Sequence, residues 1–445
     1  MTLHRTCLTF TSRGDALERV AAVLAKYRQD DYYAYERDGD WFVGLGNHST
    51  LLIDSKGENI TIAMGSKQIS RSIAGSSISA LAREFVDENL KTGGKIFGQA
   101  GFNYAAHIRR QEFKPGQWPL LSLLVPSIDL TFRRDEITIA GFDDDRVREL
   151  HDFIHNHPAN FDRAHLKTTA RIDTQENPEE YISRVEKALL EINRGNYVKV
   201  IPSRAVNIQD KVDMPATLLL GRRANNPART FSLNHAGFQA TGFSPELVMS
   251  VQERKVITEP LAGTRSCNGS EAEVERLRRE LLNDPKEIVE HVISVKEAIE
   301  ELERLCVPHS VTIDDFMSVR IRGSVQHLGS RVAGILSPDK DMWDAFEILF
   351  PSITASGIPK HTAIQAIQRL EHQTRELYSG AVIMIEDPEC FEATLVLRSV
   401  FQDATRQWIQ AGAGVISQSN PQRELRETCE KLASIAPFVV MESRP

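Results

Sequence analysis

The stretch YSGAVIMIEDPECFEATLVLRSVFQDATRQWIQAGAGVI, residues 378–416, decides the fold class. It contains three apolar runs rich in β-branched residues, 378–387, 391–403 and 406–416, which predict three strands joined by short polar turns. A further strand pair is predicted over 316–336. Helical stretches and hairpins follow one another without the regular alternation of a parallel sheet. The pattern therefore predicts an α+β fold in which mostly antiparallel sheets pack together with flanking helices.

The first third of the chain has a different pattern of predicted elements. Residues 1–165 form mainly short strands and turns, interrupted by one predicted helix over 77–94. A polar segment follows, and a helix is expected to begin at Pro178 with Asn177 as its N-cap. We expect 1–165 to be a strand-rich part integrated into the same fold as 170–445.

Composition excludes several classes of protein. Hydrophobic residues make up 41% and charged residues 26% of the 445 residues, no apolar run reaches the length of a membrane span, and Lys and Arg are dispersed in a chain of net charge −8. We therefore expect no membrane and no nucleic-acid partner. The N-terminus lacks the apolar core of a signal peptide, and the five cysteines form no C-x-x-C pair, so we expect a reduced, cytoplasmic protein.

An acidic stripe marks the predicted C-terminal helix in NPQRELRETCEKLASIAPFVV, residues 420–440. Glu424, Glu427 and Lys431 share one face at i, i+3 and i+7. The opposite face carries Leu425, Cys429, Leu432 and Ala436. Taken alone, the acidic stripe is interpreted as a solvated face, because Glu and Lys are usually exposed.

A second helix repeats this pattern in NDPKEIVEHVISVKEAIEEL, residues 283–302. Glu287 and Glu290 lie opposite an apolar stripe that we expect to be buried. That stripe consists of Ile288, Val292, Val295, Ile299 and Leu302. Asp284 as N-cap explains Glu287 locally through a capping box, but Glu290 has no such role. If the two helices faced one cleft, four carboxylates would converge on a hard divalent cation, Mg²⁺ before Zn²⁺.

Two ionisable residues interrupt predicted strands. Lys199 shares a strand face with Tyr197 and Ile201. Spacing alone favours a strand edge, where the Lys199 amine would reach solvent, over a desolvated site in which a neutral amine acts as a base. Glu246 follows the Ser244–Pro245 break. It is interpreted first as a loop or capping charge, and as a general acid if its pKa were raised.

Three further features could bind an anion, and one His could be catalytic. We place Arg398 on a strand face with Thr394, Val396 and Val400, where its guanidinium suits a carboxylate from a substrate or from a structural Asp or Glu. Tyr378 offers a hydroxyl group, and the small residues of 411–416 offer backbone N–H groups. His327 is catalytic or, as is more usual for a lone strand His, structural.

The motifs EPLAGTR, DPKEIVEH, RIRGSVQHLGS, TASGIPK, LYSGAV, QAGAGVI and PQRELRETCEKL follow one another in the last two thirds of the chain. Together they resemble the chorismate-utilising enzymes, a family of anthranilate synthase large subunits, aminodeoxychorismate synthases, isochorismate synthases and salicylate synthases. The resemblance implies the fold of anthranilate synthase component I, chorismate as substrate, and residues 170–445 as the chorismate-binding catalytic region.

Three positions resemble particular branches. Members that add water at C2 of chorismate carry a Lys at the position of Lys199, whereas amine-adding members carry Gln. Ala262 argues against aminodeoxychorismate synthases, many of which have Lys there. Thr354 and GSVQHLGS resemble salicylate synthases of siderophore pathways, which also eliminate pyruvate. The alternatives are an isochorismate synthase that stops after water addition and an inactive relative that only binds chorismate.

The resemblance also implies roles for residues. Lys199 is the expected base and Glu246 the expected acid, with His327 and Thr354 also catalytic. Glu290 and Glu427 resemble direct Mg²⁺ ligands, while Glu287 and Glu424 act through water. The expected substrate-binding residues are Tyr378, Arg398, Gly412, Gly263, Thr264 and Lys431. Because the chain resembles the water-adding branch, we expect no glutaminase subunit, and we expect a monomer.

Overall fold

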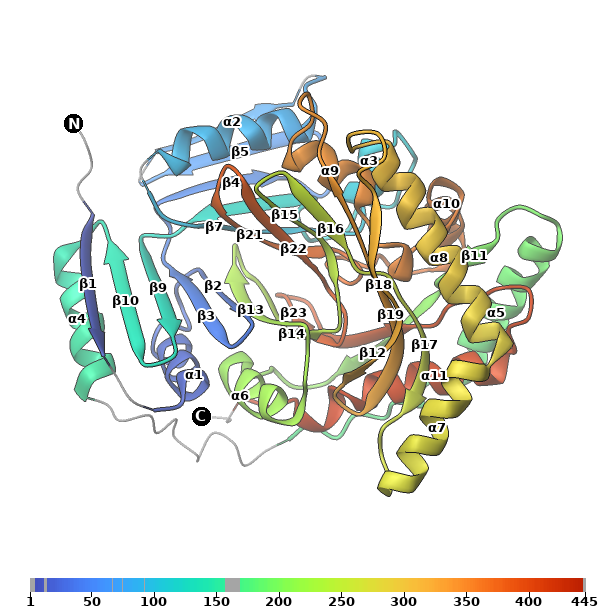
Figure 1. Ribbon diagram of the computed structural model, residues 1–445. Coiled ribbons are helices and arrows are strands. Elements are labelled where there is room, and N and C mark those ends of the chain that lie inside the picture. The colour runs from blue at the N-terminus through green and yellow to red at the C-terminus, as the bar shows by residue number, and fades with distance from the viewer. Residues whose placement is uncertain are drawn as a thin grey trace.

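The computed structural model describes residues 5–11, 14–65, 67–73, 75–91, 93–156 and 169–442. Two large sheets face each other, and helices cover their outer faces (Figure 1). The predicted α+β class with antiparallel sheets is confirmed. The predicted boundary between 165 and 170 falls at 157–168, outside the described residues. Each large sheet takes strands from both sides of this boundary.

Ten strands of the described chain form the first sheet, and each pairs antiparallel with its neighbours. Their order is β1 (Thr6–Thr11), β10 (Glu136–Gly141), β9 (Ile128–Arg133), β3 (Asp40–Leu45), β2 (Tyr32–Arg37), β13 (Arg229–His235), β14 (Phe238–Ser244), β23 (Ser399–Gln402), β24 (Gln407–Gly412) and β12 (Ser203–Ile208).

The second sheet has twelve strands within the described ranges. Eleven of them follow one another in the order β17 (Leu261–Ser266), β19 (Val325–Ile335), β16 (Lys255–Thr258), β15 (Leu247–Gln252), β22 (Cys390–Leu395), β21 (Ala381–Asp387), β7 (Ile96–Ala100), β8 (Leu121–Val125), β4 (Ser49–Ile53), β5 (Asn59–Met64) and β6 (Lys67–Ser72), and the twelfth, β18 (Thr312–Arg322), pairs with β19 off this path. The predicted pair over 316–336 is the hairpin of β18 with β19. A short ladder joins β11 (Lys199–Val200) to β20 (Gly357–Ile358).

The helices are α1 (Ala16–Lys26), α2 (Ile78–Leu90), α3 (Tyr104–Ile108), α4 (Asp144–Asn156), α5 (Pro178–Asn193), α6 (Met214–Ala224), α7 (Glu271–Asn283), α8 (Pro285–Glu303), α9 (Met342–Leu349), α10 (Lys360–Leu370) and α11 (Pro421–Ala433), with 3-10 turns η2 (Ile353–Ala355) and η3 (Ala436–Phe438). Among the described residues, no helix is both long and apolar enough to cross a membrane.

Aromatic side chains fill the space between the two sheets. Tyr33, Phe42 and Trp408 of the ten-stranded sheet belong to one buried cluster with Phe97 and Met384 of the twelve-stranded sheet. The outer face of each sheet packs against helices through a separate apolar cluster. Burial of this kind stabilises a fold by about 25 cal/mol per Å² of apolar surface, so both sheets are fixed on both faces.

The N-terminal part is more helical than its sequence predicts. The single helix expected over 77–94 is α2, but α1, α3 and α4 are also present. α1 begins where the side chain of Asp15 accepts a hydrogen bond from Leu17 N at 3.0 Å. Its buried stripe, which includes Val20 and Leu24, has the period of an amphipathic helix. The sequence of α1 therefore carries a helical pattern, although strands surround it.

The strand predicted over 391–403 is wrong as a single element. The chain leaves the twelve-stranded sheet after β22 and enters the ten-stranded sheet at β23. Arg398 lies at this crossing with a left-handed φ of 51°. It therefore shares no strand face with Thr394 or Val400, which lie in different sheets.

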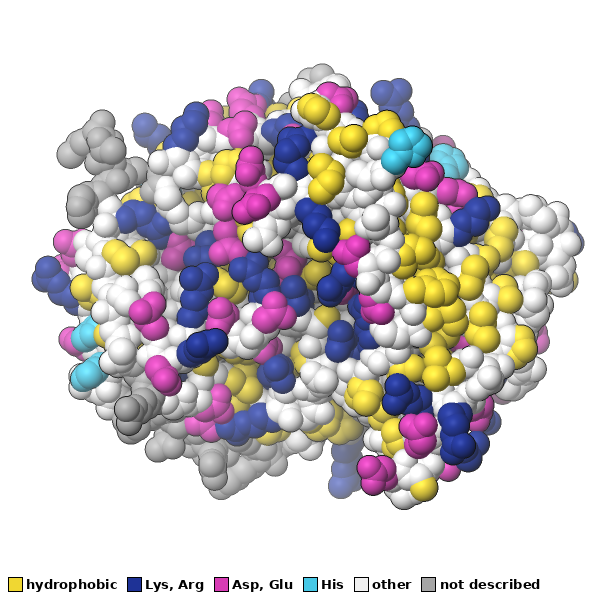
Figure 2. Space-filling view, viewed as in Figure 1, with side chains coloured by type: hydrophobic (Ala, Val, Ile, Leu, Met, Phe, Trp, Pro, Cys, Tyr) yellow, Lys and Arg dark blue, Asp and Glu magenta, His cyan; other side chains and the backbone are white. Residues whose placement is uncertain are grey.

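The buried stripe predicted for α8 is also partly wrong. Val295 and Leu302 are buried, but Val292 is 42% exposed, while Glu287 and Glu290 are buried. The reason is that the first half of α8 turns its polar face toward paired charges inside the protein. Figure 2 shows hydrophobic side chains gathered where α8 and β18 reach the surface. Val289 and Val292 of α8 and Phe316 of β18 are exposed.

Candidate active site

A cavity with about 670 Å³ of space, counted with its mouth, lies among β17, β19, β24, η2, α8 and α11. Many of the predicted site residues line it. These are Gly263, Thr264, Glu290, His327, Thr354, Tyr378, Arg398, Gly412, Glu427 and Lys431. The remaining predicted residues, Lys199, Glu246, Glu287 and Glu424, lie outside this lining.

Lys199 is buried, so its predicted placement at an exposed strand edge is wrong. Its side chain is 1% exposed, and Tyr197 and Ile201 on the same face are also buried. The Nζ atom lies 3.0 Å from Glu290 Oε1 and donates a hydrogen bond to Ser294 Oγ at 3.1 Å. The amine is thus held between two groups of α8, one of which lines the cavity.

Glu246 is fully buried, which excludes a solvated loop charge. Ser352 Oγ donates a hydrogen bond to Glu246 Oε1 at 3.1 Å, while Oε2 has no hydrogen-bond partner in the described structure. Burial raises the pKa of Glu246 to about 8, although the hydrogen bond from Ser352 opposes this effect. The carboxyl group is therefore protonated at neutral pH and can give up a proton.

His327 is bound at both ring nitrogens. Nδ1 donates to the carbonyl oxygen of Gly263 at 2.9 Å, and Thr264 Oγ1 lies 3.3 Å from the same nitrogen. Since a carbonyl oxygen only accepts, Nε2 of the neutral ring accepts the hydrogen bond from Arg398 Nη2. Burial and the charge of Arg398 hold the pKa of His327 well below its ordinary value. The ring is thus a neutral support for Arg398.

Arg398 keeps its charge without an acidic partner. Its Nη1 donates to the carbonyl oxygen of Arg322 at 2.8 Å, and no Asp or Glu of the described chain lies within ion-pair distance. Burial lowers the pKa of Arg398 to about 10, which leaves the guanidinium charged at neutral pH. Of the two readings from sequence, a structural Asp or Glu is excluded within the described residues. A carboxylate of a ligand remains.

Backbone contacts hold the other lining residues. Thr354 Oγ1 donates to the carbonyl oxygen of Leu261 at 3.1 Å, which fixes the turn of η2 against β17. Lys431 Nζ donates to the carbonyl oxygen of Gly412 at 2.9 Å and lies 2.8 Å from Glu427 Oε1. The Lys431 ammonium therefore joins α11 to the end of β24.

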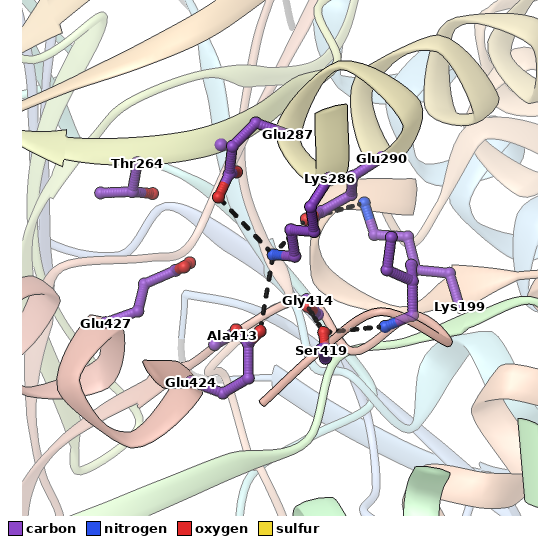
Figure 3. Close-up of polar contacts among 12 residues, drawn as sticks. Lys199, Thr264, Lys286, Glu287, Glu290, Ala413, Gly414, Ser419, Glu424 and Glu427 are labelled. Carbon is purple, nitrogen blue, oxygen red and sulfur yellow. Dashed lines mark hydrogen bonds and ion pairs between the residues drawn. The ribbon is translucent and has the colours of Figure 1, made fainter. Parts of the chain in front are cut away.

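The two acidic helices meet, so the solvated-face interpretation is wrong. Figure 3 shows Glu287 and Glu290 of α8 facing Glu424 and Glu427 of α11. Glu287 and Glu424 have no exposed surface. The ammonium group of Lys286, which sequence reasoning missed, lies among these carboxylates. Its Nζ is 2.9 Å from Glu290 Oε2, 3.5 Å from Glu424 Oε1 and 3.8 Å from Glu287 Oε1.

Charge pairing divides the carboxylates into two kinds. Burial opposes ionisation of Glu290, but the ammonium groups of Lys199 and Lys286 outweigh it and hold its pKa well below the ordinary range. Burial, together with the charge of Glu427, raises the pKa of Glu424 to about 7. Neither Glu424 oxygen accepts a hydrogen bond from any described residue.

The acidic cluster offers the donors of a hard divalent cation. All four side chains present carboxylate oxygens, and Glu287 Oε2 and both Glu424 oxygens are buried without a hydrogen bond in the described structure. Such oxygens fit Mg²⁺. Within the described ranges, however, no three acidic, His or Cys side chains are already arranged as a ligand set.

Two glycines allow close approach to this cluster. Gly263 has a φ of +70°, and a Cβ there would lie 2.8 Å from Glu287 Oε2. A Cβ on Gly414 would lie 2.2 Å from Glu290 Oε1. Any larger residue would displace a carboxylate.

Comparisons with known proteins found a matching family model and similar proteins. The family model described as chorismate binding enzyme matches residues 30–437. Salicylate synthase of Mycolicibacterium paratuberculosis is 37% identical over 433 residues, which cover 96% of this chain and 93% of that protein. Anthranilate synthase component 1 of Spirochaeta aurantia is 36% identical over 266 residues, which cover 59% of this chain and 55% of that protein.

Solved structures show the same fold at lower identity. Anthranilate synthase component I from Streptococcus pneumoniae superposes with a TM-score of 0.75 at 21% identity, covering 91% of this chain and 92% of that one. The menaquinone-specific isochorismate synthase MenF from Escherichia coli gives a TM-score of 0.73 at 20% identity, covering 98% of this chain and 95% of that one.

Proposed function

Because the chain belongs to the family of chorismate-binding enzymes, we propose that it is a salicylate synthase, which converts chorismate into isochorismate and then into salicylate and pyruvate. One observation carries the proposal. A buried amine, Lys199, and a carboxyl group that is protonated at neutral pH, Glu246, each contact residues of the cavity wall. Water addition with loss of a hydroxyl group needs such a base and such an acid. The likeness to a salicylate synthase over nearly the whole chain supports the same choice.

Chorismate carries two carboxylates, and the cavity has groups suited to both. The Arg398 guanidinium, which has no acidic partner in the described chain, would bind the enolpyruvyl carboxylate together with the Tyr378 hydroxyl and the backbone N–H of Gly412. Glu290 and Glu427, with Glu287 and Glu424 acting through water, would hold Mg²⁺, which supplies positive charge opposite the ring carboxylate.

In the first step, Lys199 has to lose the ammonium proton that pairs it with Glu290, and this proton passes to solvent. The neutral amine then takes a proton from water, whose oxygen bonds to C2 of the ring. The ring double bonds shift, and the C4–O bond breaks. Glu246 gives its proton to the departing hydroxyl group, which leaves as water. One water enters and one leaves, so the product is isochorismate. A positioned acid or base contributes about 10² to 10⁴ in rate.

In the second step, the enolpyruvyl group takes the hydrogen from C2 while its bond to C3 breaks, giving salicylate and pyruvate. This transfer within the substrate needs no protein base, so the chain supplies orientation. Both nitrogens of His327 are already engaged, by Gly263 and by Arg398. We therefore assign His327 to the orientation of Arg398, and Thr354 to the shape of the wall beside Leu261.

The proposal is tested by incubating the purified chain with chorismate, with Mg²⁺ or with excess EDTA, and by separating the products. Salicylate and pyruvate in equal amounts, formed only with the metal, are expected. Isochorismate as the only product would assign the chain to the isochorismate synthases. No turnover would favour a relative that only binds chorismate.

A further inference from the structure

Lys286 lies at the centre of the acidic cluster that Figure 3 draws. Its ammonium contacts carboxylates of both acidic helices, Glu287 and Glu290 of α8 and Glu424 of α11. These are the side chains to which the proposed function assigns the divalent metal. One of the protein's own cations thus occupies the place where oxygen donors converge.

The position of Lys286 on its helix is unfavourable apart from these contacts. It is the second residue of α8, directly after Pro285, where the positive end of the helix dipole repels a cation. Its side chain is only 7% exposed, so the ammonium has also lost most of its water. The ion pairs and the hydrogen bond recorded for Nζ are made to carboxylates of the cluster. The carboxylates therefore hold the Lys286 ammonium in its buried position.

Glu290 shows why the ammonium and a metal compete. Both of its oxygens are taken by ammonium groups, Oε1 by Lys199 at 3.0 Å and Oε2 by Lys286 at 2.9 Å. A Mg²⁺ ion binds oxygen at about 2.1 Å, so on Oε2 it would lie close to the ammonium, and two cations that close together repel each other. Lys199 has a second partner in Ser294, whereas among the described residues Lys286 is paired only with carboxylates. Of the two ammonium groups, that of Lys286 is therefore the one that a metal ion would displace.

We propose that Lys286 is a tethered counter-ion, which neutralises the acidic cluster before the metal binds and has to leave the cluster for the metal to enter. The inference rests on the proposed Mg²⁺ site. It explains why the carboxylates converge without forming a ready ligand set in the described structure. It also makes the protein's affinity for Mg²⁺ lower than that of the same four carboxylates without the lysine.

The test compares Lys286→Gln with the wild-type protein by calorimetric titration of Mg²⁺ and by thermal unfolding in EDTA. The Gln variant should bind Mg²⁺ at least about tenfold more tightly, because no ammonium has to be displaced. In EDTA the variant should unfold at a lower temperature than the wild type, and saturating Mg²⁺ should remove this difference. If the variant does not fold in EDTA, recovery of the fold on adding Mg²⁺ has the same meaning.

Two control variants separate the effect of removing the charge from a general loss of stability. Lys286→Arg keeps the cation and should keep the wild-type affinity for Mg²⁺. Lys360→Gln removes another buried lysine paired with a glutamate of α8, Glu301 at 2.6 Å, and should lower stability without changing Mg²⁺ affinity.

Unchanged or weaker Mg²⁺ binding by Lys286→Gln would overturn the inference, as would an equal gain in the Arg variant or a Gln variant that Mg²⁺ does not restore. If the wild type binds Mg²⁺ and makes salicylate, these results leave the proposed function intact. A wild type that shows neither would instead overturn the proposed function and, with it, this inference.

Discussion

Replacement of Glu246 by Gln should change the pH dependence of stability in a predictable way. The substitution keeps the size of the side chain but removes its ionisation. A pKa of about 8 in the folded protein, against an ordinary value of 4.5, corresponds to about 5 kcal/mol at about 1.4 kcal/mol per pH unit. This is the free energy by which an ionised Glu246 destabilises the folded state.

The sign follows from proton binding. Between pH 4.5 and 8 the folded protein keeps the Glu246 proton while the unfolded chain loses it, so this group makes stability fall as pH rises. Between pH 5 and pH 8 the free energy of unfolding of the wild type should fall by about 3 to 4 kcal/mol more than that of Glu246→Gln. Urea unfolding of both proteins at the two pH values measures this difference. If the free energy of unfolding changed equally with pH in both proteins, the argument that Glu246 is buried and protonated would be refuted.

The same variant separates the two proposed steps. Without an acid for the C4 hydroxyl, turnover of chorismate should fall about 10² to 10⁴-fold. Conversion of supplied isochorismate to salicylate should continue, because elimination uses no protein acid. Equal loss with both substrates would contradict the role given to Glu246.

Other substitutions test the remaining roles. Lys199→Gln should abolish isochorismate formation from chorismate yet leave conversion of supplied isochorismate, and normal turnover of chorismate would refute the base assignment. Arg398→Lys should raise the KM for chorismate about tenfold to a hundredfold, because a charged hydrogen bond is worth about 1.5–3 kcal/mol; a KM within twofold of the wild type would count against the carboxylate contact. Glu290→Gln should abolish calorimetric Mg²⁺ binding, and an unchanged titration would exclude it as a ligand.

The fold class could be predicted from the strand pattern, and the family from the order of the motifs. Both were confirmed, because alternation along strands and family motifs are properties of the chain itself. The burial of individual polar residues was not predictable in this way. Lys199, Glu246 and Glu424 were first interpreted as exposed, the usual state of such residues, but packing of distant segments places all three inside.

The errors at Arg398 and Lys286 have the same origin. A crossing between two sheets leaves an apolar run that resembles one long strand, so the break at Arg398 could not be seen from its neighbours. Lys286 was missed because its contact with Glu424 joins two helices that lie more than a hundred residues apart in the sequence. The local signals were its placement in the first turn of a helix, against the dipole, and its i, i+4 spacing to Glu290.

The central claim is that water attacks C2 and that elimination follows in the same protein. It is tested most directly by running the reaction from chorismate in oxygen-18-enriched water and analysing the salicylate by mass spectrometry. The mechanism predicts one heavy oxygen per salicylate, in the phenolic hydroxyl group. Salicylate without the heavy isotope would contradict water addition and with it the roles of Lys199 and Glu246.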